Sequence, residues 1–325
     1  MKTINTVLGQ ISSDKVGKTL MHEHFVFGYP GWQGDVTIGP FNREAAIQAG
    51  ISMAEKVKSH GVKTVVDATP NECGRDPLIL KEISEKTGIN IVCSSGYYFE
   101  GEGAPAYFKF RSALGNVSAE LYEMFKKEVT EGIADTGIKP GVFKLASSRD
   151  AITDYEMMFF KAAAKVSKEE NIPIITHTQE GKQGPKQADV LISEGVDPKR
   201  IMIGHIEGNT DIEYLLSVLE KGVYIGFDRF GIQGLAGAPL DTRREACLIG
   251  LIGLGYANQI MLSHDVVNYW LGRPLVLPAP AMKLVAKWHP THIFDDIIPV
   301  LQKAGVTNGQ INTLLVENPR KFFEA

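Results

Sequence analysis

Cysteine is scarce in this sequence, with three residues in 325 at positions 73, 93 and 247. The three are odd in number, lie far apart and form no C-x-x-C pair. This spacing argues against a disulfide framework and against a thiolate zinc site. So few cysteines are typical of a protein from a reducing compartment.

Long apolar runs and basic tracts are also absent. No uninterrupted apolar stretch is long enough to span a bilayer, and Met1–Val7 lacks the apolar core of a signal peptide. Lys and Arg number 34 and Asp and Glu number 38, which gives a net charge of −4. We therefore expect a cytoplasmic protein whose partners include neither nucleic acid nor membranes.

The remaining composition is ordinary for a globular protein, with 44% hydrophobic and 22% charged residues. No linker or low-complexity segment divides the chain. The sequence therefore predicts a single domain that spans residues 1–325.

Eight short runs are rich in β-branched and apolar residues, and most are continuous instead of alternating with polar residues. Continuous runs are typical of parallel strands that are covered on their outer face. The predicted strands are Thr19–Phe25, Thr64–Thr69, Asn90–Gly96, Gly141–Ala146, Pro173–Thr178, Arg200–Ile206, Tyr224–Phe230 and Gln259–Asp265.

Segments with helical periodicity lie between these runs, and several end at a glycine, as helices commonly do. Strand followed by helix, eight times over with short links, predicts an α/β fold of the (β/α)8 TIM-barrel type. The predicted helices are Arg43–Ser59, Asp76–Lys86, Ser118–Asp135, Asp154–Glu170, Asp211–Lys221 and Thr242–Gly253.

Two loops are longer than a minimal barrel needs, which is unusual unless they are functional. Tyr97–Leu114, after the third strand, could line the pocket or a subunit interface. Val266–His289, after the eighth strand, could form a channel for an acyl chain, or could pack over the barrel rim or in a dimer contact. The tail, Asp295–Glu324, predicts two further helices, the second capped by Thr307.

Metal-ligand side chains lie at the ends of four predicted strands. His22 and His24 are two apart on the first strand and can therefore face the same way. His177, His205 and Asp265 end the fifth, sixth and eighth strands, and the carboxyl ends of barrel strands converge on one mouth. Imidazole and carboxylate ligands suit zinc, iron, cobalt or manganese.

This ligand set is large for one ion, and a pair of ions needs an anionic ligand between them. Lys144 is the candidate that faces inward from the fourth strand. An ammonium group would repel the metals, so Lys144 fits only if it is deprotonated or converted to a carbamate. Spacing alone leaves this bridging role open.

A structural interpretation competes at each of these positions. A single histidine in a barrel is more often a packed residue than a ligand, and His-x-His is common by chance. Five ligand-type residues at the ends of predicted strands favour a metal centre. His60, His289 and His292 fall outside the strand ends, and we interpret them as structural or surface residues.

At these positions the sequence resembles the phosphotriesterase family of the amidohydrolase superfamily, and is most similar to the phosphotriesterase-like lactonases. The resemblance runs from about Ile4 to Arg320, nearly the whole chain. The matching segments are Leu20–His24, Gly141–Lys144, Thr176–Thr178, Ile203–His205, Asp228–Gly231 and Leu262–Asp265.

The resemblance implies two divalent metal ions, with zinc the first expectation and iron, cobalt or manganese the others. Carboxylated Lys144 and a hydroxide would bridge them. The ligands of the more buried ion would be His22, His24 and Asp265. The ligands of the more exposed ion would be His177 and His205.

Three catalytic residues follow from the same resemblance. Tyr98 would lie over the metal pair, and Asp265 would receive the proton of the bridging hydroxide. Arg229 stands where lactonases have arginine and true phosphotriesterases differ. The family usually places an aspartate three residues after the sixth-strand histidine, but this chain has Gly208 there. Glu207 could substitute for it, or the relay could be absent.

The expected function is therefore the opening of lactone rings, either N-acyl homoserine lactones or γ- and δ-lactones, with promiscuous phosphotriesterase activity. The metal-bridging hydroxide would attack the lactone carbonyl, and the enzyme is expected to be a homodimer. A dedicated phosphotriesterase or arylesterase is the first alternative, and Arg229 counts against it. The others are an amidohydrolase-type amidase or deaminase, commonly with one metal, and an inactive binding protein.

Overall fold

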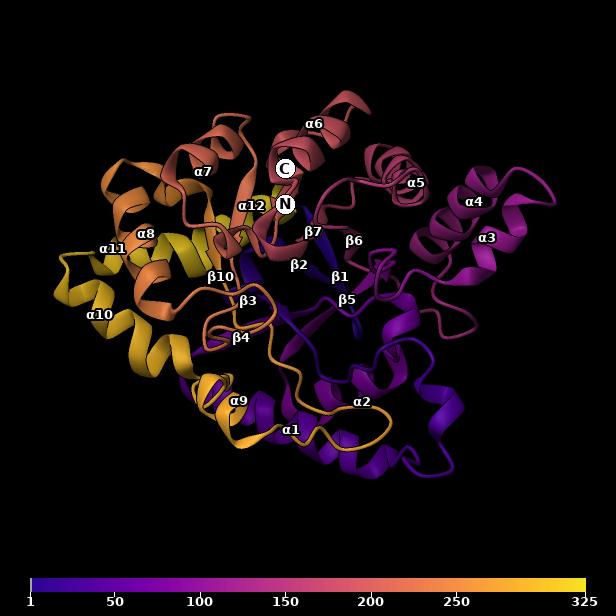
Figure 1. The fold of residues 1–325 in the computed structure, drawn as a ribbon, viewed down its shortest axis with the longest axis horizontal. Coiled ribbons are helices and arrows are strands. Elements are labelled where there is room, and N and C mark those ends of the chain that lie inside the picture. The colour runs from indigo at the N-terminus through magenta and orange to yellow at the C-terminus, as the bar shows by residue number, and fades with distance from the viewer. Residues whose placement is uncertain (1) are drawn as a thin grey trace.

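A computed structural model describes residues 2–325 and shows eight parallel strands arranged as a barrel with helices around it (Figure 1). Neighbouring strands follow chain order, from β3 to β10. The predicted (β/α)8 TIM barrel is confirmed. The strands are β3 (Lys18–Glu23), β4 (Val62–Asp67), β5 (Asn90–Gly96), β6 (Val142–Ser147), β7 (Ile174–Thr178), β8 (Ile201–Ile203), β9 (Tyr224–Phe227) and β10 (Ile260–Leu262).

Backbone hydrogen bonds join the first and last strands where the chain leaves them. The Asp265 amide donates to the His22 carbonyl at 3.0 Å, and the His24 amide donates to the Val266 carbonyl at 2.9 Å. The buried carboxylate of Glu23 accepts from the Val266 amide at 2.9 Å. These contacts close the barrel beside the predicted metal ligands.

Successive residues of most strands are buried on opposite sides of the barrel wall, which explains the continuous apolar runs. One set fills the barrel interior and includes Met21, Val66, Val92, Ile175, Met202 and Met261. The other set packs beneath the helices and includes Leu20, Val65, Ile91, Ile174, Ile203 and Leu262.

The surrounding helices begin at recognisable caps. The Asp76 side chain accepts from the Leu78 and Ile79 amides at the start of α2, and Thr153 forms a capping box with Glu156 at α5. The helices are α1 (Arg43–Ser59), α2 (Pro77–Thr87), α4 (Val117–Thr130), α5 (Asp154–Glu170), α6 (Gly184–Ser193), α7 (Ile212–Leu219) and α8 (Asp241–Gly253).

Two features of this helical layer differ from the prediction. The helix predicted over Ser118–Asp135 ends at Thr130, because Gly132 turns the chain with a φ of 126°. The short helix α6 was not among the predicted helix ranges. It lacks a side-chain cap, and Gln183 precedes it in the left-handed conformation.

Both long loops contain a short helix. The loop after β5 holds α3 (Ala106–Ser112), and the loop after β10 holds α9 (Ala279–Leu284). Short 3-10 turns elsewhere span Ser13–Lys15, Trp32–Asp35, Asn71–Cys73, Gln179–Gly181, Pro198–Arg200, Ile206–Gly208 and Tyr256–Gln259.

The tail forms the two predicted helical segments, and Thr307 caps the second through a capping box with Gln310. Each segment contains a π-helical turn just before a proline, which cannot donate an amide hydrogen bond. The elements are a π turn (Ile293–Ile297), α10 (Ile298–Lys303), α11 (Asn308–Asn312), a second π turn (Thr313–Glu317) and α12 (Asn318–Glu324).

An antiparallel hairpin of β1 (Thr3–Thr6) and β2 (Gly9–Ser12) precedes the barrel and was not predicted. The two ends of the chain meet, since the Lys2 ammonium donates to the Ala325 carbonyl at 2.6 Å (Figure 1). Within residues 2–325, no helix has both the length and the apolar character needed to cross a membrane.

Candidate metal centre

All eight predicted site residues line one cavity of about 190 Å³ at the carboxyl ends of the strands. Seven of them come from the ends of β3, β5, β7, β8, β9 and β10, and Lys144 comes from the middle of β6. The eight residues are His22, His24, Tyr98, Lys144, His177, His205, Arg229 and Asp265.

His22 and His24 both reach this cavity because β3 is irregular. Leu20 packs beneath the helices and Met21 packs inside the barrel, so regular alternation would turn His22 away from the centre. The pairing of β3 with β4 shifts register between Leu20 and Glu23. This shift lets both histidines follow Met21 on the inner side of the wall.

Asp265 lies at the centre of the cluster. Its Oδ1 is 2.9 Å from His24 Nε2 and 3.5 Å from His22 Nε2. Its Oδ2 is 3.7 Å from His205 Nε2 and accepts from Arg229 Nε at 3.0 Å. Burial alone would raise the pKa of Asp265, but the neighbouring histidines and Arg229 hold that pKa well below its usual range.

One carboxylate orients a histidine on each side of the cluster. Asp228 Oδ1 is 2.8 Å from His205 Nδ1, and Asp228 Oδ2 is 3.1 Å from His22 Nδ1. The carboxylate fits because glycines stand beside it. A Cβ at Gly204 or Gly226 would come within 2.9 Å or 2.5 Å of Asp228 Oδ2.

The other two histidines are held by neutral acceptors. His24 Nδ1 is 2.8 Å from Thr69 Oγ1, and His177 Nε2 is 2.7 Å from the Gln179 amide oxygen. These acceptors therefore hold one ring nitrogen of each imidazole, and the Nε2 atoms of His22 and His24 contact Lys144 and Asp265 within the cluster. Metal-binding histidines are usually oriented by such partners.

Lys144 is buried, and its ammonium nitrogen lies 2.9 Å from His22 Nε2. Burial lowers the pKa of Lys144 from 10.5 to about 8. At pH 7 most of this amine is still protonated, but its neutral fraction is larger than that of an exposed lysine. The neutral amine is the form that can become a carbamate.

His205 and Asp265 lie just past their strands in left-handed backbone conformations, each with a φ of 56°. This conformation costs free energy for any residue other than glycine and recurs at functional sites. It lets both side chains turn from the strand ends into the cavity.

The donor chemistry fits two divalent ions. Ligand atoms of His22, His24 and Asp265 lie within 4.8 Å of one another, close enough to share one ion. His177 and His205 form a second pair, with ring centroids 4.7 Å apart. Burial lowers the pKa values of His22, His177 and His205 and keeps these rings neutral, the form that binds metal.

Tyr98 and Arg229 stand over this donor set. The Tyr98 ring meets His177 edge-on at a centroid distance of 5.0 Å, and burial raises the pKa of Tyr98 well above its usual value. Burial would lower the Arg229 pKa, but Asp265 outweighs that effect and raises it. Tyr98 is therefore a hydrogen-bond donor and Arg229 a fixed positive charge.

Other residues considered from the sequence lie elsewhere. Glu207 does not line the cavity, and burial raises its pKa to about 8. The His60 ring stacks on Phe294. His292 lies between the carboxylate of Asp241 and that of Asp296, and one ring nitrogen contacts each.

No role was predicted for Asp228, Thr69 or Gln179. A signal existed for Asp228, which lies near the end of the seventh predicted strand and precedes Arg229. Thr69 and Gln179 follow their strands without any motif. Which acceptor orients which ring depends on neighbouring strands, and the linear spacing does not reveal it.

The rest of the cavity wall is mainly apolar and comes largely from the loop after β10. Tyr29 stacks near Trp270 at a centroid distance of 6.3 Å and adds to this wall. The apolar lining residues are Phe27, Ile232, Leu235, Val267, Trp270, Leu275, Leu277, Val285 and Trp288.

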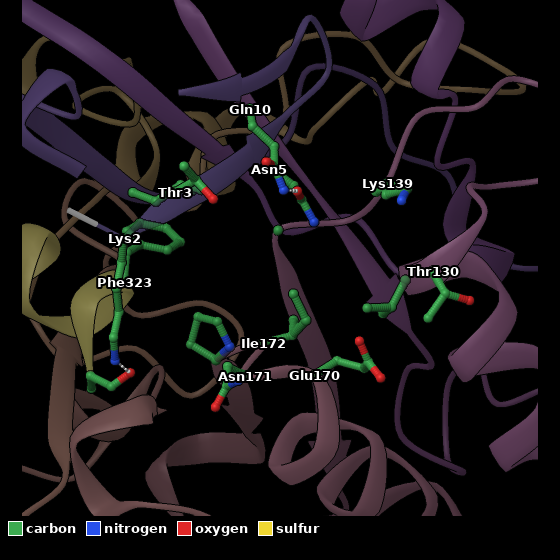
Figure 2. A pocket seen from close by; sticks show the side chains of 15 residues that line it. Lys2, Thr3, Asn5, Gln10, Thr130, Lys139, Glu170, Asn171, Ile172 and Phe323 are labelled. Carbon is green, nitrogen blue, oxygen red and sulfur yellow. Dashed lines mark hydrogen bonds between the residues drawn. The ribbon is translucent and has the colours of Figure 1, made fainter. Parts of the chain in front are cut away.

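A larger hollow of about 580 Å³ lies at the opposite end of the barrel (Figure 2). Lys2, Asn5, Gln10 and Lys139 border it, beside the segments that lead into β6 and β7. None of the predicted site residues lines this hollow. In barrels, this amino-terminal end serves stability more than catalysis.

Comparisons with known proteins agree with this geometry. The phosphotriesterase family model matches residues 2–323. An aryldialkylphosphatase from Saccharolobus solfataricus is 36% identical over 96% of both chains. An organophosphorus hydrolase from Deinococcus radiodurans is 54% identical, covers 99% of this chain and 96% of its own, and superposes with a TM-score of 0.97.

A further solved structure comes from molecular engineering of organophosphate hydrolysis activity from a weak promiscuous lactonase template. It is 52% identical to this chain, covers 99% of this chain and 100% of its own, and superposes with a TM-score of 0.98.

Proposed function

Since the chain belongs to the phosphotriesterase family of metal-dependent hydrolases acting on esters, we propose that its preferred substrates are lactones. These are N-acyl homoserine lactones or γ- and δ-lactones. The observation that carries this proposal is Arg229, which is charged, lines a mainly apolar cavity and is paired with Asp265. The relative built on a weak promiscuous lactonase template supports the same substrate class.

The proposed centre binds two divalent ions, with zinc the first candidate. His22, His24 and Asp265 would hold one ion, and His177 and His205 the other, with carboxylated Lys144 between them. When bound, the ions supply Lewis acidity that lowers the pKa of a water molecule toward 7 and polarises the substrate carbonyl.

The protein residues then guide the proton and the ring. Water adds to the carbonyl carbon, and the ring C–O bond breaks. Asp265 is deprotonated at rest, so it accepts the proton of the water and passes it to the departing alkoxide. The product is a hydroxy acid. The Tyr98 hydroxyl and the Arg229 guanidinium orient the lactone ring over the centre.

The apolar wall is the proposed channel for an acyl chain. The loop after β10 lines the cavity through Val267, Trp270, Leu275 and Trp288. A hydrocarbon chain bound against these side chains would be shielded from water. Each buried methylene contributes about 0.8 kcal/mol, so lactones with longer chains should bind more tightly until the channel is filled.

A dedicated phosphotriesterase or arylesterase is the second candidate. The aryldialkylphosphatase and organophosphorus hydrolase among the relatives favour it. The same site can accept a phosphorus centre, because attack by water and the charge to be stabilised are alike. We therefore expect weak phosphotriesterase activity beside the lactonase activity.

We also propose that the enzyme is a homodimer. Tyr107, Phe110 and Leu114 on or just after α3 are 60%, 62% and 62% exposed, and a subunit contact would cover these large apolar side chains. Sedimentation velocity at micromolar concentration tests this, with a single monomeric species as the contradicting result.

A series of homoserine lactones with acyl chains of increasing length tests the proposed function. Ring opening releases a proton and can be followed with a pH indicator. The proposal predicts ring opening throughout and a KM that falls with chain length in the native enzyme. A Leu275→Ser variant should flatten this trend, with Leu254→Ser as an exposed control outside the cavity. Absence of ring opening would contradict the lactone assignment.

A further inference from the structure

Glu207 is a fully buried carboxylate that the proposed mechanism does not use. Its Oε1 accepts two backbone hydrogen bonds, from the Asp228 amide at 3.0 Å and from the Arg229 amide at 2.7 Å. Within residues 2–325, no other side chain accepts from these two amides. Glu207 therefore holds the peptide that carries both Asp228 and Arg229.

The residues that follow are held by Arg244, whose side chain is fully buried. Arg244 Nη1 donates to the Arg229 carbonyl at 2.5 Å, and Nη2 donates to the Ile232 carbonyl at 2.6 Å. Arg244 Nη1 also lies 3.9 Å from Glu207 Oε1. The segment just after β9 is thus held by two buried side chains. Glu207 binds its backbone amides, and Arg244 binds its backbone carbonyls.

Position 208 has no room for the aspartate that the resembled family usually has there. A Cβ on Gly208 would lie 2.7 Å from the Gly181 nitrogen and 2.9 Å from the Glu180 carbonyl carbon, and both are backbone atoms that cannot rotate away. The carboxylate on Glu207 instead reaches beneath the end of β9. It does not line the cavity, so it is not positioned to relay a proton from Asp265.

We propose that Glu207 is a positioning residue that orients both halves of the metal centre through the Asp228–Arg229 peptide. This inference rests on the proposed metal centre. Asp228 contacts His22 with one carboxylate oxygen and His205 with the other. Arg229 contacts Asp265. Movement of a single peptide would therefore disturb a ligand of each ion at the same time.

Three substitutions separate geometry from ionisation. Glu207→Gln keeps an oxygen that can accept from both amides but cannot ionise. Glu207→Asp keeps an ionisable carboxyl group but is one methylene too short to reach the amides. Glu207→Ala removes both. Glu220→Ala, on the exposed surface after α7, is the matched control.

The readouts are cobalt affinity, the visible absorption spectrum of the cobalt-loaded enzyme, and KM and kcat. Loss of a partner that orients metal ligands typically lowers metal affinity 10- to 100-fold. We expect this loss, with an altered cobalt spectrum, in Glu207→Asp and Glu207→Ala. Glu207→Gln and Glu220→Ala should keep the native affinity and spectrum.

The contrast between Gln and Asp decides the proposal even if the alanine variant does not fold. If Glu207→Asp retains native cobalt affinity and Glu207→Gln loses it, charge matters and the positioning role is wrong. The role is equally wrong if Glu207→Asp loses thermal stability while its cobalt affinity and spectrum stay native. Cobalt affinity and the cobalt spectrum need no substrate, so a failure of the lactone assignment would leave these two readouts unchanged.

Discussion

Arg229 donates a hydrogen bond from Nε to Asp265 Oδ2 at 3.0 Å, and both side chains are almost completely buried. The Arg229 guanidinium binds one oxygen of the Asp265 carboxylate, and the other oxygen faces His22 and His24. Asp265 is therefore kept charged and fixed in orientation. This contact joins the proposed catalytic carboxylate to the residue that favours the lactonase interpretation.

Replacing Asp265 by asparagine tests its proton-accepting role. Asp265→Asn preserves the shape of the side chain but cannot accept the proton, so kcat should fall about 10²- to 10⁴-fold while the fold is retained. Steady-state kinetics and circular dichroism measure both effects. Asp150→Asn, an exposed change in the loop after β6, is the control. A near-native kcat in Asp265→Asn would rule out the assigned role.

Arg229→Gln removes the charge that pairs with Asp265 and faces the substrate. We expect kcat/KM for lactones to fall about tenfold or more, since a charge-assisted contact of about 1.4 kcal/mol or more is lost. The loss for a phosphotriester should be smaller. Arg243→Gln, on the exposed side of α8, controls for general charge effects. Equal losses on both substrate classes would show that Arg229 does not set substrate preference.

Gly208→Asp restores the aspartate that is usual in the resembled family. The structure predicts that this change fails to improve activity and destabilises the protein by about 1–3 kcal/mol, because its Cβ meets the backbone at Gly181. Chemical denaturation measures this free energy. Gly115→Asp, where nothing lies within 4 Å of the added Cβ, should be nearly neutral. A stable and more active Gly208→Asp enzyme would contradict the packing argument.

His292 lies outside the metal centre, and its contacts should make the stability of the protein depend on pH. Burial alone would lower its pKa, but hydrogen bonds to Asp241 and Asp296 outweigh burial and raise the pKa above 6.5. Lys287, which is paired with Asp296, and the nearby ring of His289 oppose this effect in part. Protonated His292 therefore adds to the free energy of unfolding. This contribution is complete below about pH 6.5 and disappears as the pH rises through the pKa of His292 in the folded protein.

The difference in unfolding free energy between the native protein and His292→Asn should therefore shrink from pH 5.5 to pH 8.5. His289→Asn is an informative control. Burial lowers the pKa of His289, so the stability that this residue contributes should instead decrease as the pH falls. Denaturation at several pH values measures both trends. A constant difference for His292→Asn would show that the buried contacts do not depend on protonation.

The barrel and the cluster of ligands could be predicted because both follow from local rules. Parallel strands that are buried on both faces appear in the sequence as continuous apolar runs. Residues at the carboxyl ends of these strands converge on one mouth of the barrel. His22 and His24 meet this expectation through a register shift that the sequence does not display. The single-domain organisation, the ligand roles and the homodimer stay predictions.

The contacts that orient the cluster could not be predicted, because they depend on neighbouring strands that are distant in the sequence. Asp228 bonds His22 from 206 residues away and His205 from 23 residues away. Glu207 was considered as a relay, whereas it binds backbone amides below the cavity. The space at Gly208 is set by Gly181 on another strand end.

The most direct test of this account measures kcat/KM for homoserine lactones, plain γ- and δ-lactones, an aryl ester and a phosphotriester on one sample whose bound metal is counted. The account predicts two divalent ions per chain, loss of activity on chelation with recovery on adding metal, and lactones leading by orders of magnitude. A phosphotriester or aryl ester in the lead would contradict the lactonase assignment, and one ion per chain would contradict the binuclear centre.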